Sequence, residues 1–395
     1  MKALTELKVT DLLREDNRSF EEQWEMQDRL FKTLQRRLIE EALETERSEF
    51  VCCSWHARTS GRKDYRNGYW QRWILLKNGR LAVRMPRLRA FCYESKIILR
   101  YLKRMSEVDE ALKRVFLFGA STRLTGQALQ PLLGETLSAQ TISRIARSLD
   151  SEVARYHARS LPDTYVYLFL DGIMLKVKTG TGARKKAVLV AYGITREGKR
   201  ELIDFMVTKS ENVHTWEGFL LNLSRRGLVG TMLQLIVTDG HQGLMNAVDL
   251  TYPGIPRQRC WAHKLRNVTN YLRKKDSDAC IKEAREIYNA QNRREAVQAY
   301  YRWRKKWRSI SSGAVGCIEK DLEELLAFYA CAQGLYKKLR TTNVIERAFR
   351  EVRRRTRPMS CFNNTPSIER IVYAVLNHLN DQWGKRPLKE FTQKG

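Results

Sequence analysis

The chain has 395 residues, of which 43% are hydrophobic and 10% aromatic, so we expect a folded protein of more than one domain, and its eight scattered cysteines fit reduced thiols. Lysine and arginine number 72 against 44 acidic residues, a formal net charge of +28, which favours nucleic acid over an anionic membrane surface as the partner. No apolar run is long enough to cross a membrane, and the first residues lack the apolar core of a signal peptide, so we expect a cytoplasmic protein.

The N-terminal region is predicted to contain a long amphipathic helix. Residues 20–46 carry large apolar side chains at helical spacing with dense charge between them, and the helix either packs on a core or forms a dimer contact. Residues 1–50 hold 13 acids and 9 bases, whereas residues 51–115 hold 16 bases and 5 acids. Only the second segment therefore has the charge of a DNA-binding surface.

A basic β-hairpin is predicted next. Residues 69–89, YWQRWILLKNGRLAVRMPRLR, are rich in strand-forming residues around the turn signal Asn78-Gly79, and Arg66-Asn67-Gly68-Tyr69 precedes them. The hairpin is either a solvated edge or a phosphate-binding surface, and its density of arginine favours the second. The candidate DNA-binding residues here are Arg66, Arg80, Arg84, Arg87 and Arg89.

Residues 119–149 are predicted to form two short helices separated at Gly134. The second helix would bury Ile142, Ile145 or Ala146, and Leu149. It would expose Gln140, Ser143, Arg144 and Arg147. This pattern is typical of a helix-turn-helix whose second helix reads DNA, although a helical hairpin that only packs gives the same pattern.

A β-β-β-α-β order follows. Strands are predicted at 165–172, 186–194 and 201–207, then a helix around 216–223 and a strand at 233–238. The first strand is expected to end at Asp171-Gly172, and the fourth at Asp239-Gly240.

The remaining chain is predicted to be helical and basic. In the stretch from about 267 to 335, Trp303 and Trp307 lie four residues apart, so they share one helix face that either packs internally or presents a ring on which an unpaired base stacks. A last arginine-rich helix is expected to start at Asn343, to carry Glu346, and to stop before Pro358.

Three acids have both ordinary and catalytic interpretations. Asp171-Gly172 fits a hairpin turn, Asp239 fits a helix N-cap, and Glu346 fits a capping box that starts at Asn343. Alternatively, the two aspartates meet at one edge of a sheet and the glutamate joins them from a helix packed across it. Such carboxylates hold Mg²⁺, and two ions can serve a phosphodiester displacement.

Four motifs favour the catalytic interpretation. In this order and spacing, YLFLDGIMLKVK, LIVTDGHQGL, QRCWAHKLRN and LRTTNVIERAFREVRRRTR resemble the transposases of bacterial insertion sequences in the Mutator-like superfamily. The resemblance runs from about Arg66 to Arg357 and is densest after residue 160.

The resemblance implies an α/β fold in which an all-α insertion domain interrupts a ribonuclease-H-like catalytic core. It also implies a catalytic, metal-binding triad of Asp171, Asp239 and Glu346 with two Mg²⁺ ions, for which Mn²⁺ is expected to substitute. In the Cys-x-x-His that follows the second aspartate, we expect Cys260 and His263 to support the site by packing and hydrogen bonding. The arginines expected to grip phosphates near the cut are Arg347, Arg350, Arg353 and Arg354.

The expected organisation has five segments. These are an N-terminal dimerisation and basic DNA-binding region of mixed helix and β-hairpin (1–115), a helix-turn-helix region (116–163), the first part of the core (164–269), the helical insertion (270–335), and the second part of the core with the C-terminal tail (336–395).

The predicted function is that of a DNA transposase located in the bacterial nucleoid. It would bind double-stranded DNA at the terminal inverted repeats as a homodimer or higher homo-oligomer, hydrolyse a phosphodiester at the element's end, and join the exposed 3′-hydroxyl to target DNA. The alternatives are a structure-selective nuclease of the same fold and a non-catalytic DNA-binding regulator.

Overall fold

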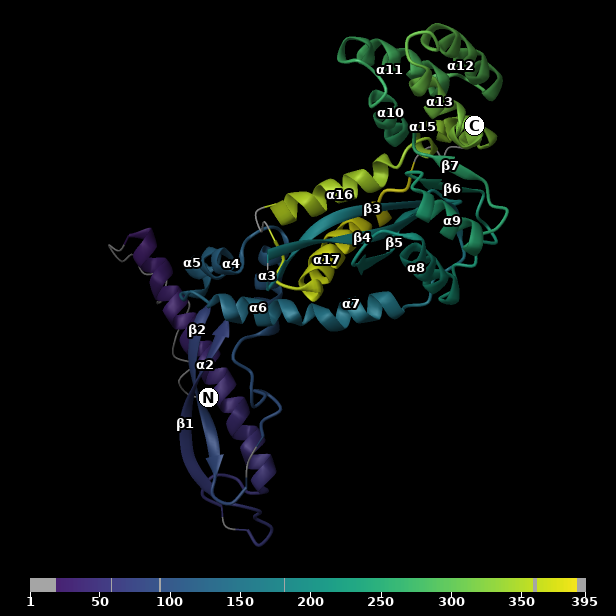
Figure 1. Ribbon diagram of the computed structural model, residues 1–395. Helices are drawn as coiled ribbons and strands as arrows, with labels where there is room; N and C mark the ends of the chain where they lie inside the picture. The colour runs from purple at the N-terminus through teal and green to yellow at the C-terminus, as the bar shows by residue number, and fades with distance from the viewer. Residues whose placement is uncertain (1–18, 58, 92–93, 181, 358–360, 389–395) are drawn as a thin grey trace. The chain divides into compact units, whose positions relative to one another are not determined.

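The computed structural model describes residues 19–57, 59–91, 94–180, 182–357 and 361–388. By their internal contacts, the residues form two compact units. The first comprises Met1–Arg114 with Thr122–Ile142, and the second comprises Val115–Ser121 with Ser143–Gly395. The architecture is mixed α/β with a central sheet, as predicted (Figure 1). Within the described residues, no helix combines the length and the apolar character that crossing a membrane requires.

The predicted N-terminal helix is present as α2 (Phe20–Val51). A capping box starts it, because the Ser19 hydroxyl accepts a hydrogen bond from the Glu22 amide and the Glu22 carboxylate accepts one from the Ser19 amide. Its C-terminal half is anchored by the buried side chains of Leu43 and Val51. The part of the helix from Phe20 to Leu38 instead leaves large apolar side chains exposed, namely Phe20, Trp24, Phe31 and Leu38.

The predicted hairpin is confirmed as the antiparallel pair β1 (Arg66–Leu76) and β2 (Gly79–Leu88). The turn lies at Lys77-Asn78, one residue earlier than expected, because Leu76 pairs directly with Gly79. The inner face of the hairpin packs on α2 through a small core. Its members include Leu43, Ile74, Leu76, Leu81, Val83 and Met85.

Short helices follow the hairpin. Gly134 ends the short helix before it with φ +73, a backbone conformation that favours glycine. It separates two of these helices at the position where the sequence predicted a break. The helices are α3 (Ser106–Leu117), α4 (Thr122–Ala128), α5 (Gln130–Leu133), α6 (Ala139–Arg147) and α7 (Leu149–Ala158).

The second unit is built on a five-stranded sheet of order β5-β4-β3-β6-β7, with β3 in the middle (Figure 1). The strands β3, β4 and β5 form an antiparallel meander, while β6 and β7 run parallel to β3. The four predicted strands are all present, and β7 is an addition whose three-residue sequence RQR gave no strand signal. The strands are β3 (Tyr165–Thr179), β4 (Gly182–Thr195), β5 (Arg200–Thr208), β6 (Leu235–Thr238) and β7 (Arg257–Arg259).

The expected end of the first strand at Asp171-Gly172 is wrong. Strand β3 continues to Thr179 and pairs with β4 along that whole length. The cause is visible in the sequence after Gly172, where buried Ile173, Leu175 and Val177 alternate with exposed residues in the period of two that a strand requires.

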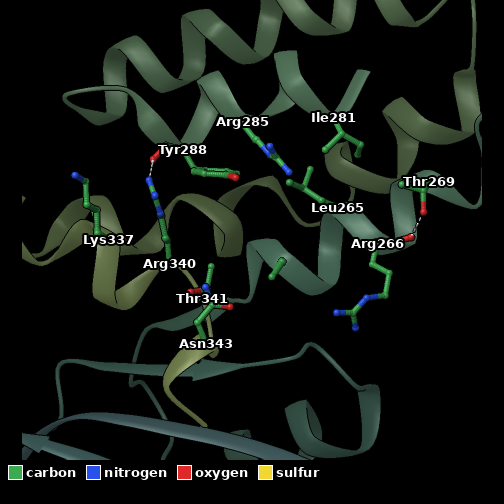
Figure 2. A pocket seen from close by; sticks show the side chains of 11 residues that line it. Leu265, Arg266, Thr269, Ile281, Arg285, Tyr288, Lys337, Arg340, Thr341 and Asn343 are labelled. Atoms are coloured by element: carbon green, nitrogen blue, oxygen red, sulfur yellow. Dashed lines mark hydrogen bonds between the residues drawn. The ribbon is translucent and has the colours of Figure 1, made fainter. Parts of the chain in front are cut away.

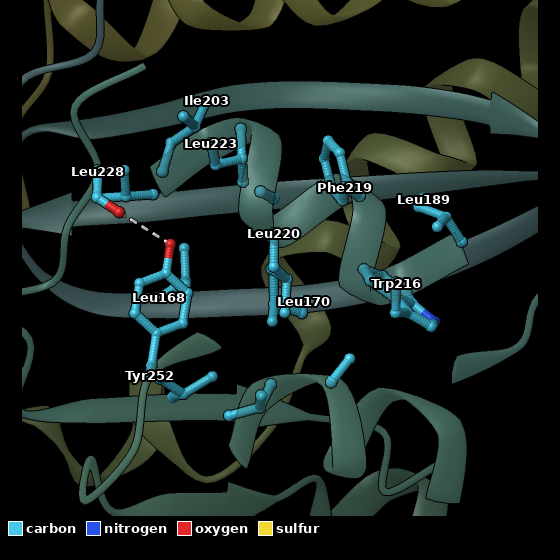
Figure 3. Packing of buried hydrophobic residues seen from close by; sticks show 14 of the residues in the cluster. Leu168, Leu170, Leu189, Ile203, Trp216, Phe219, Leu220, Leu223, Leu228 and Tyr252 are labelled. Carbon is cyan, nitrogen blue, oxygen red and sulfur yellow. Dashed lines mark hydrogen bonds between the residues drawn. The ribbon is translucent and has the colours of Figure 1, made fainter. Parts of the chain in front are cut away.

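Helices cover both faces of the sheet. On one face, α8 (Val213–Arg225) and α9 (Gln242–Thr251) pack against the sheet through a core that includes Leu168, Leu170 and Trp216 (Figure 3). On the other face, the ring centroids of Phe169 and Tyr192 are 5.4 Å apart. Those of Tyr192 and Trp383, which belongs to the C-terminal helix, are 5.6 Å apart. Because side chains alternate along a strand, Asp171 shares this second face with Phe169. Two helices cover that face, α16 (Asn343–Thr356) and α17 (Thr365–Gly384).

A helical segment separates β7 from α16. It carries its own core, in which Trp303 and Trp307 are almost completely buried. The helices are α10 (Trp261–Thr269), α11 (Lys274–Asn289), α12 (Arg293–Trp307), α13 (Ser312–Glu319), α14 (Leu322–Leu326) and α15 (Tyr336–Leu339), with 3₁₀ turns at Ala327–Ala330 and Gln333–Leu335.

Candidate active site

Two aspartates that are far apart in the sequence are brought together at the edge of the sheet where β6 ends. The parallel pairing of β3 with β6 runs from Tyr167–Leu235 to Leu170–Thr238. Asp171 and Asp239 are the next residues on these two strands, and neighbouring strands are about 4.8 Å apart. The sheet topology therefore brings the two carboxylates together at the point where β6 ends.

Asp171 is held in an unfavourable electrostatic position. Its side chain is 4% exposed, and Oδ1 accepts a hydrogen bond of 2.8 Å from the Gly172 amide. Burial and then the nearby charge of Asp239 raise the pKa of Asp171 to about 7, although His263, the Gly172 amide and the Thr342 hydroxyl oppose the rise. Asp171 is therefore a carboxyl group that a nearby cation would stabilise in its charged form.

Asp239 is not the N-cap of the following helix. Helix α9 has His241 at its N-cap, and no side chain forms a capping hydrogen bond there. Asp239 Oδ1 instead accepts a hydrogen bond of 2.9 Å from the His241 amide, which orients the carboxylate in the turn after β6. Gly240 adopts φ +85, and a Cβ there would lie 3.0 Å from the guanidinium of Arg259. The turn therefore favours glycine directly after the aspartate.

Glu346 does not form a capping box. Helix α16 starts at Asn343, as predicted, but its N-cap is Thr342, whereas a capping box with Glu346 needs Asn343 at that position, and no side chain caps the helix. Glu346 therefore lies within the first turns of α16, and its Oε1 is 3.8 Å from His263 Nε2. Helix α16 packs on β3, so Glu346 approaches from the face that Asp171 shares. Helix α16 ends at Thr356, before Pro358 as predicted. Pro358 itself lies outside the described residues.

Cys260 connects the strand that leads to Asp239 with the helix that carries Glu346. The Cys260 amide donates to the Thr238 carbonyl at 2.8 Å, and the Cys260 sulfur accepts from the amide and hydroxyl of Thr342 at 3.3 and 3.4 Å. Burial raises the pKa of the Cys260 thiol, so it stays neutral. Thr342, which the sequence did not single out, thus joins the site from the N-cap of α16, a position where threonine is common.

The residues fit a hard dication by their chemistry. The three acids supply only oxygen ligands, which Mg²⁺ prefers, and the repulsion between Asp171 and Asp239 is what a cation would relieve. His263 Nδ1 is buried and has no hydrogen-bond partner among the described residues. In the same part of the chain, no three His, Cys, Asp or Glu side chains lie close enough together to hold a metal ion.

A positively charged pocket is lined in part by the chain neighbours of His263 and Thr342, namely Ala262, Thr341 and Asn343 (Figure 2). It has a volume of about 380 Å³ and is lined by residues of α10, α11 and α15 and by the start of α16. Arg340 is fixed in it, because Nη1 donates to the Tyr288 carbonyl at 3.0 Å and to Asn289 Oδ1 at 2.7 Å. The lining contains four cations and no acid. These are Arg266, Arg285, Lys337 and Arg340.

The four arginines expected on α16 are exposed. Arg354 also pairs with Glu351 at 2.8 Å. By contrast, Arg355 is buried and donates to the carbonyls of Phe116 and Leu117, so its role is in packing. The exposed set is Arg347, Arg350, Arg353 and Arg354.

The expected phosphate contact of Arg66 is wrong. Its side chain is 10% exposed and donates to Ser48 Oγ at 2.9 Å and to the Cys53 carbonyl at 2.7 Å, so it ties the hairpin to the end of α2. Arg84 is exposed but pairs with Glu40 at 2.8 Å, and Arg80 lies 3.6 Å from Glu135. Arg87 and Arg89 are also exposed.

The faces of α6 match the sequence prediction except at Ser143, which is half-buried, and at Leu149, which is buried but begins α7. Ile142 and Ile145 are buried. Gln140, Arg144 and Arg147 are exposed. The helix thus has the polar outer surface that contact with DNA would require.

The tryptophans of α12 are internal, and the stacking role considered for them is wrong. Trp303 Nε1 donates to the Cys280 carbonyl at 3.2 Å, and Trp307 Nε1 donates to Glu283 Oε2 at 2.8 Å. Each side chain is 3% exposed. The helical segment would have to open before a base could reach either ring, so packing is their role.

Comparisons with known proteins agree on one family. The sequence pattern described as "Transposase, Mutator family" matches residues 5–386. The transposase for insertion sequence element IS406 of Burkholderia multivorans is 34% identical over 353 residues, which are 88% of this chain and 89% of that protein. The transposase for ISRM5 of Rhizobium meliloti is 32% identical over 88% of this chain and 87% of its own length.

More distant relatives and one solved structure complete the comparison. The transposase for IS256 in transposon Tn4001 of Staphylococcus aureus is 29% identical over 91% of this chain and 93% of its own length. A chain in the structure of the simian T-cell lymphotropic virus intasome with a regulatory subunit of PP2A is 13% identical, over 55% of this chain and 65% of that one. The TM-score is 0.18, too low to support an argument about the fold.

Proposed function

This chain belongs to the Mutator family of transposases, and we propose on that basis that it binds the terminal inverted repeats of an insertion sequence, cleaves there and joins the cut end to target DNA. In this proposal, residues 164–269 and 336–395 form a ribonuclease-H-like core, and residues 270–335 are its helical insertion. The catalytic residues are Asp171, Asp239 and Glu346.

One observation carries the proposal. Asp171 and Asp239 follow the last paired residues of adjacent parallel strands, and Glu346 comes from a helix packed on that face of the sheet. None of the three has the ordinary role that its local sequence allowed, since one lies within a strand, one does not cap α9, and one is not in a capping box. Three acids near one edge of the sheet, none of them in the turn or capping role that its local sequence suggested, favour a catalytic role.

The proposed reaction is two displacements at phosphorus. In the first, the oxygen of a water molecule bonds to phosphorus, the bond to the 3′ oxygen at the element's end breaks, and a 3′-hydroxyl is released. In the second, this hydroxyl bonds to a phosphorus of target DNA, and the target's own 3′ oxygen leaves with a proton. In the first step a water proton passes to the 3′ oxygen and a favourable hydrolysis results. The second step exchanges one phosphodiester for another, so no external energy source is needed.

The chain's residues divide this work. Asp171, Asp239 and Glu346 would hold two Mg²⁺ ions, with Mn²⁺ as a substitute, and such ions stabilise the charge on the attacking and leaving oxygens. Cys260 bonds to Thr238, next to Asp239, and to Thr342, the N-cap of the helix that carries Glu346. These two bonds position Asp239 and Glu346 relative to each other. The cationic pocket of Figure 2 and the exposed arginines of α16 would bind the phosphates on either side of the cut.

Recognition of the ends is assigned to residues before the sheet. We place the reading of base edges on the exposed face of α6, which carries Gln140, Arg144 and Arg147, in a helix-turn-helix. Arg80, Arg87 and Arg89 of the hairpin would contact phosphates. The test of this proposal has two parts. The protein must bind terminal DNA, and the variant Asp239→Asn must bind that DNA but fail to cleave it.

Binding to duplex DNA is expected to weaken steeply with salt. Each phosphate that the protein neutralises releases counterions, so a plot of log association constant against log salt concentration should fall by about 0.9 per contact. Replacing Arg350 with glutamine should make that slope shallower by about 0.9, since one contact is lost. Fluorescence anisotropy with labelled terminal DNA measures both slopes, and a parent slope near zero would contradict any nucleic acid partner.

The proposed homo-oligomer has a candidate contact on α2. Phe20, Trp24, Phe31 and Leu38 are between 56% and 74% exposed, and the last three recur every seven residues, the spacing of a coiled-coil seam. Since the opposite side of the helix packs on the hairpin, this edge is left without an apolar partner among the described residues of its own unit.

Charge indicates that a second copy of α2 covers this edge in the antiparallel direction. Residues 21–28 contain four acids and no base, and residues 29–37 contain four bases and no acid. Antiparallel pairing centred on residue 29 puts Phe20 opposite Leu38 and Glu21 opposite Arg37. A parallel pair would place like charges together, which is unfavourable.

Replacing both Trp24 and Phe31 with lysine is expected to convert the oligomer into smaller species in sedimentation equilibrium, because it puts charge into the apolar seam. Glu21→Arg should weaken the association by repulsion from Arg37, and adding Arg37→Glu should restore it, since the swapped pair attracts again. A parent protein that is already monomeric, or a swap that fails to restore the mass, would disprove this contact.

A further inference from the structure

The N-terminal unit contains an open groove that the proposed catalytic chemistry does not use. It has a volume of about 470 Å³ and lies along β1, residues 100–104 and the loop at 135–137. Backbone hydrogen bonds fix its wall, because the Leu75 amide donates to the Lys103 carbonyl and the Met105 amide donates to the Leu75 carbonyl, both at 3.0 Å. The groove is therefore part of the folded unit and does not depend on a loose loop.

Three large aromatic side chains line this groove and remain exposed. Trp70 is 40% exposed, Trp73 is 48% exposed and Tyr101 is 82% exposed. Single exposed apolar residues are common on proteins, but several that converge on one hollow indicate a binding surface. Rings of this size offer flat faces on which another flat group can stack.

Cations alternate with the rings. The Arg80 guanidinium lies 4.7 Å from the centre of the Trp73 ring, and the Arg100 guanidinium lies 5.6 Å from that of Tyr101. Glu135 is the acid in the lining, and it lies 3.6 Å from Arg80. The five cations of the lining are Arg72, Arg80, Arg100, Lys103 and Arg104.

Interleaved rings and cations match the chemistry of a single nucleic acid strand. Unpaired bases present faces that stack on aromatic side chains, and the phosphates between them bind arginine and lysine. A DNA duplex offers the phosphates but hides the base faces in its own stack, so it would leave the three rings unused. Neither purely electrostatic binding of a duplex nor an apolar partner explains both sets of residues.

We propose that this groove binds unpaired nucleotides of a DNA strand, with bases stacked on Trp70, Trp73 or Tyr101 and phosphates held by the surrounding cations. The inference rests on the proposed function only for its DNA partner, since a nicked or displaced strand supplies unpaired bases. It does not depend on the assignment of the catalytic acids, and it places single-strand binding in a different unit from those acids.

The test compares single-stranded and duplex DNA in the full-length Asp239→Asn protein, which leaves both probes intact. The probes are an oligothymidylate of about 15 nucleotides and the duplex terminal repeat. Trp70→Ala with Trp73→Ala, and separately Tyr101→Ala, should weaken binding of the oligothymidylate by roughly tenfold or more. Binding of the duplex should change by less than about threefold, since phosphate contacts are kept.

Tyr65→Ala is the matched control. Tyr65 is 58% exposed in the same unit and has the Arg62 guanidinium 4.3 Å from its ring centre, so it repeats the Tyr101–Arg100 pair outside the groove. This variant should bind the oligothymidylate like its parent. Phenylalanine at positions 70 and 73 should restore most of the affinity because it stacks, and the ring variants should keep the parent's salt dependence because they remove no charge.

Three results would overturn the inference. They are unchanged oligothymidylate binding in the ring variants, an equal loss in the Tyr65 control, and an equal loss for duplex and single strand. In all three cases duplex binding by the Asp239→Asn parent leaves the proposed function standing. A parent that binds neither probe would contradict both the inference and the proposed function.

Discussion

Replacing Asp239 with asparagine is expected to abolish both nicking and joining of terminal DNA in Mg²⁺ or Mn²⁺. If Asp239 helps to hold the metal, losing its charge removes several kcal/mol of stabilisation from the transition state, or roughly three orders of magnitude in rate. Asp171→Asn and Glu346→Gln should have the same effect. Gel assays on a labelled element end with an added target plasmid measure the two steps separately.

Asparagine is the informative substitution because it preserves the local structure. The oxygen that accepts the hydrogen bond from the His241 amide is kept, so the turn after β6 should form as before. Terminal DNA should bind with unchanged affinity and the melting temperature should stay within a few degrees. Loss of activity with binding retained would then identify a chemical role.

Asp249→Asn provides the matched control. Asp249 is an exposed aspartate on the neighbouring helix α9, where it pairs with Arg257, and its loss should leave nicking and joining intact. Strong residual cleavage by Asp239→Asn would contradict the triad. A parent that binds but never cuts would indicate a regulator, and one that cuts without joining would indicate a nuclease.

Replacing Asp171 with asparagine is expected to stabilise the metal-free protein at pH 8. The folded protein raises the pKa of Asp171 from 3.8 to about 7, so the folded state holds this proton more tightly than the unfolded chain does. The contribution of Asp171 to stability is therefore fully present below about pH 4 and is lost as the pH rises through 7. An amide avoids the buried charge and its repulsion from Asp239.

The gain should accordingly depend on pH. Relative to the parent, the free energy of unfolding of Asp171→Asn should increase between pH 4 and pH 8 by up to roughly 4 kcal/mol, the equivalent of three pKa units. Urea denaturation at several pH values with chelator present measures it. A constant difference across this range would show that Asp171 is not perturbed as the structure indicates.

Two further measurements connect this result with metal binding. Added Mg²⁺ should stabilise the parent at pH 8 but not Asp171→Asn, a readout that does not require catalysis.

Asp163→Asn is the control, because the pKa of Asp163 is shifted in the opposite direction to that of Asp171. Although burial opposes it, hydrogen bonds from Thr231 and the Gly230 amide lower the pKa of Asp163. Its replacement should therefore destabilise the protein near neutral pH without changing the response to Mg²⁺.

Local sequence patterns were sufficient for most of the elements and for their chemistry. The period of 3.6 in α2, the turn signal at Asn78-Gly79 and the apolar runs before Asp171 and Asp239 predicted helix, hairpin and strands because each depends on neighbours in the chain. The alternation of Ile173, Leu175 and Val177 is a local pattern of the same kind, and it accounts for the part of β3 that extends beyond the predicted strand end.

The surroundings of individual side chains depended on the tertiary structure. Arg66 was predicted to contact phosphate, but the fold places it against the backbone carbonyl of Cys53. For Trp303 the sequence left packing and stacking open, and contact with α11 buries the ring. Burial of a side chain is decided by segments far away in the sequence, which a local pattern does not contain.

By itself, the sequence determined the charge, the order of the elements and the presence of three acids that suit Mg²⁺. Only the tertiary structure decided that Asp171 and Asp239 directly follow paired residues of neighbouring parallel strands. It also decided that Cys260 bonds to Thr342 and so links the end of β6 to the start of α16. The physical reason is that strand pairing and helix packing bring together residues 68 and 107 positions apart in the chain. Such contacts follow from the hydrogen bonding of the sheet and the burial of its faces, and no local spacing specifies them.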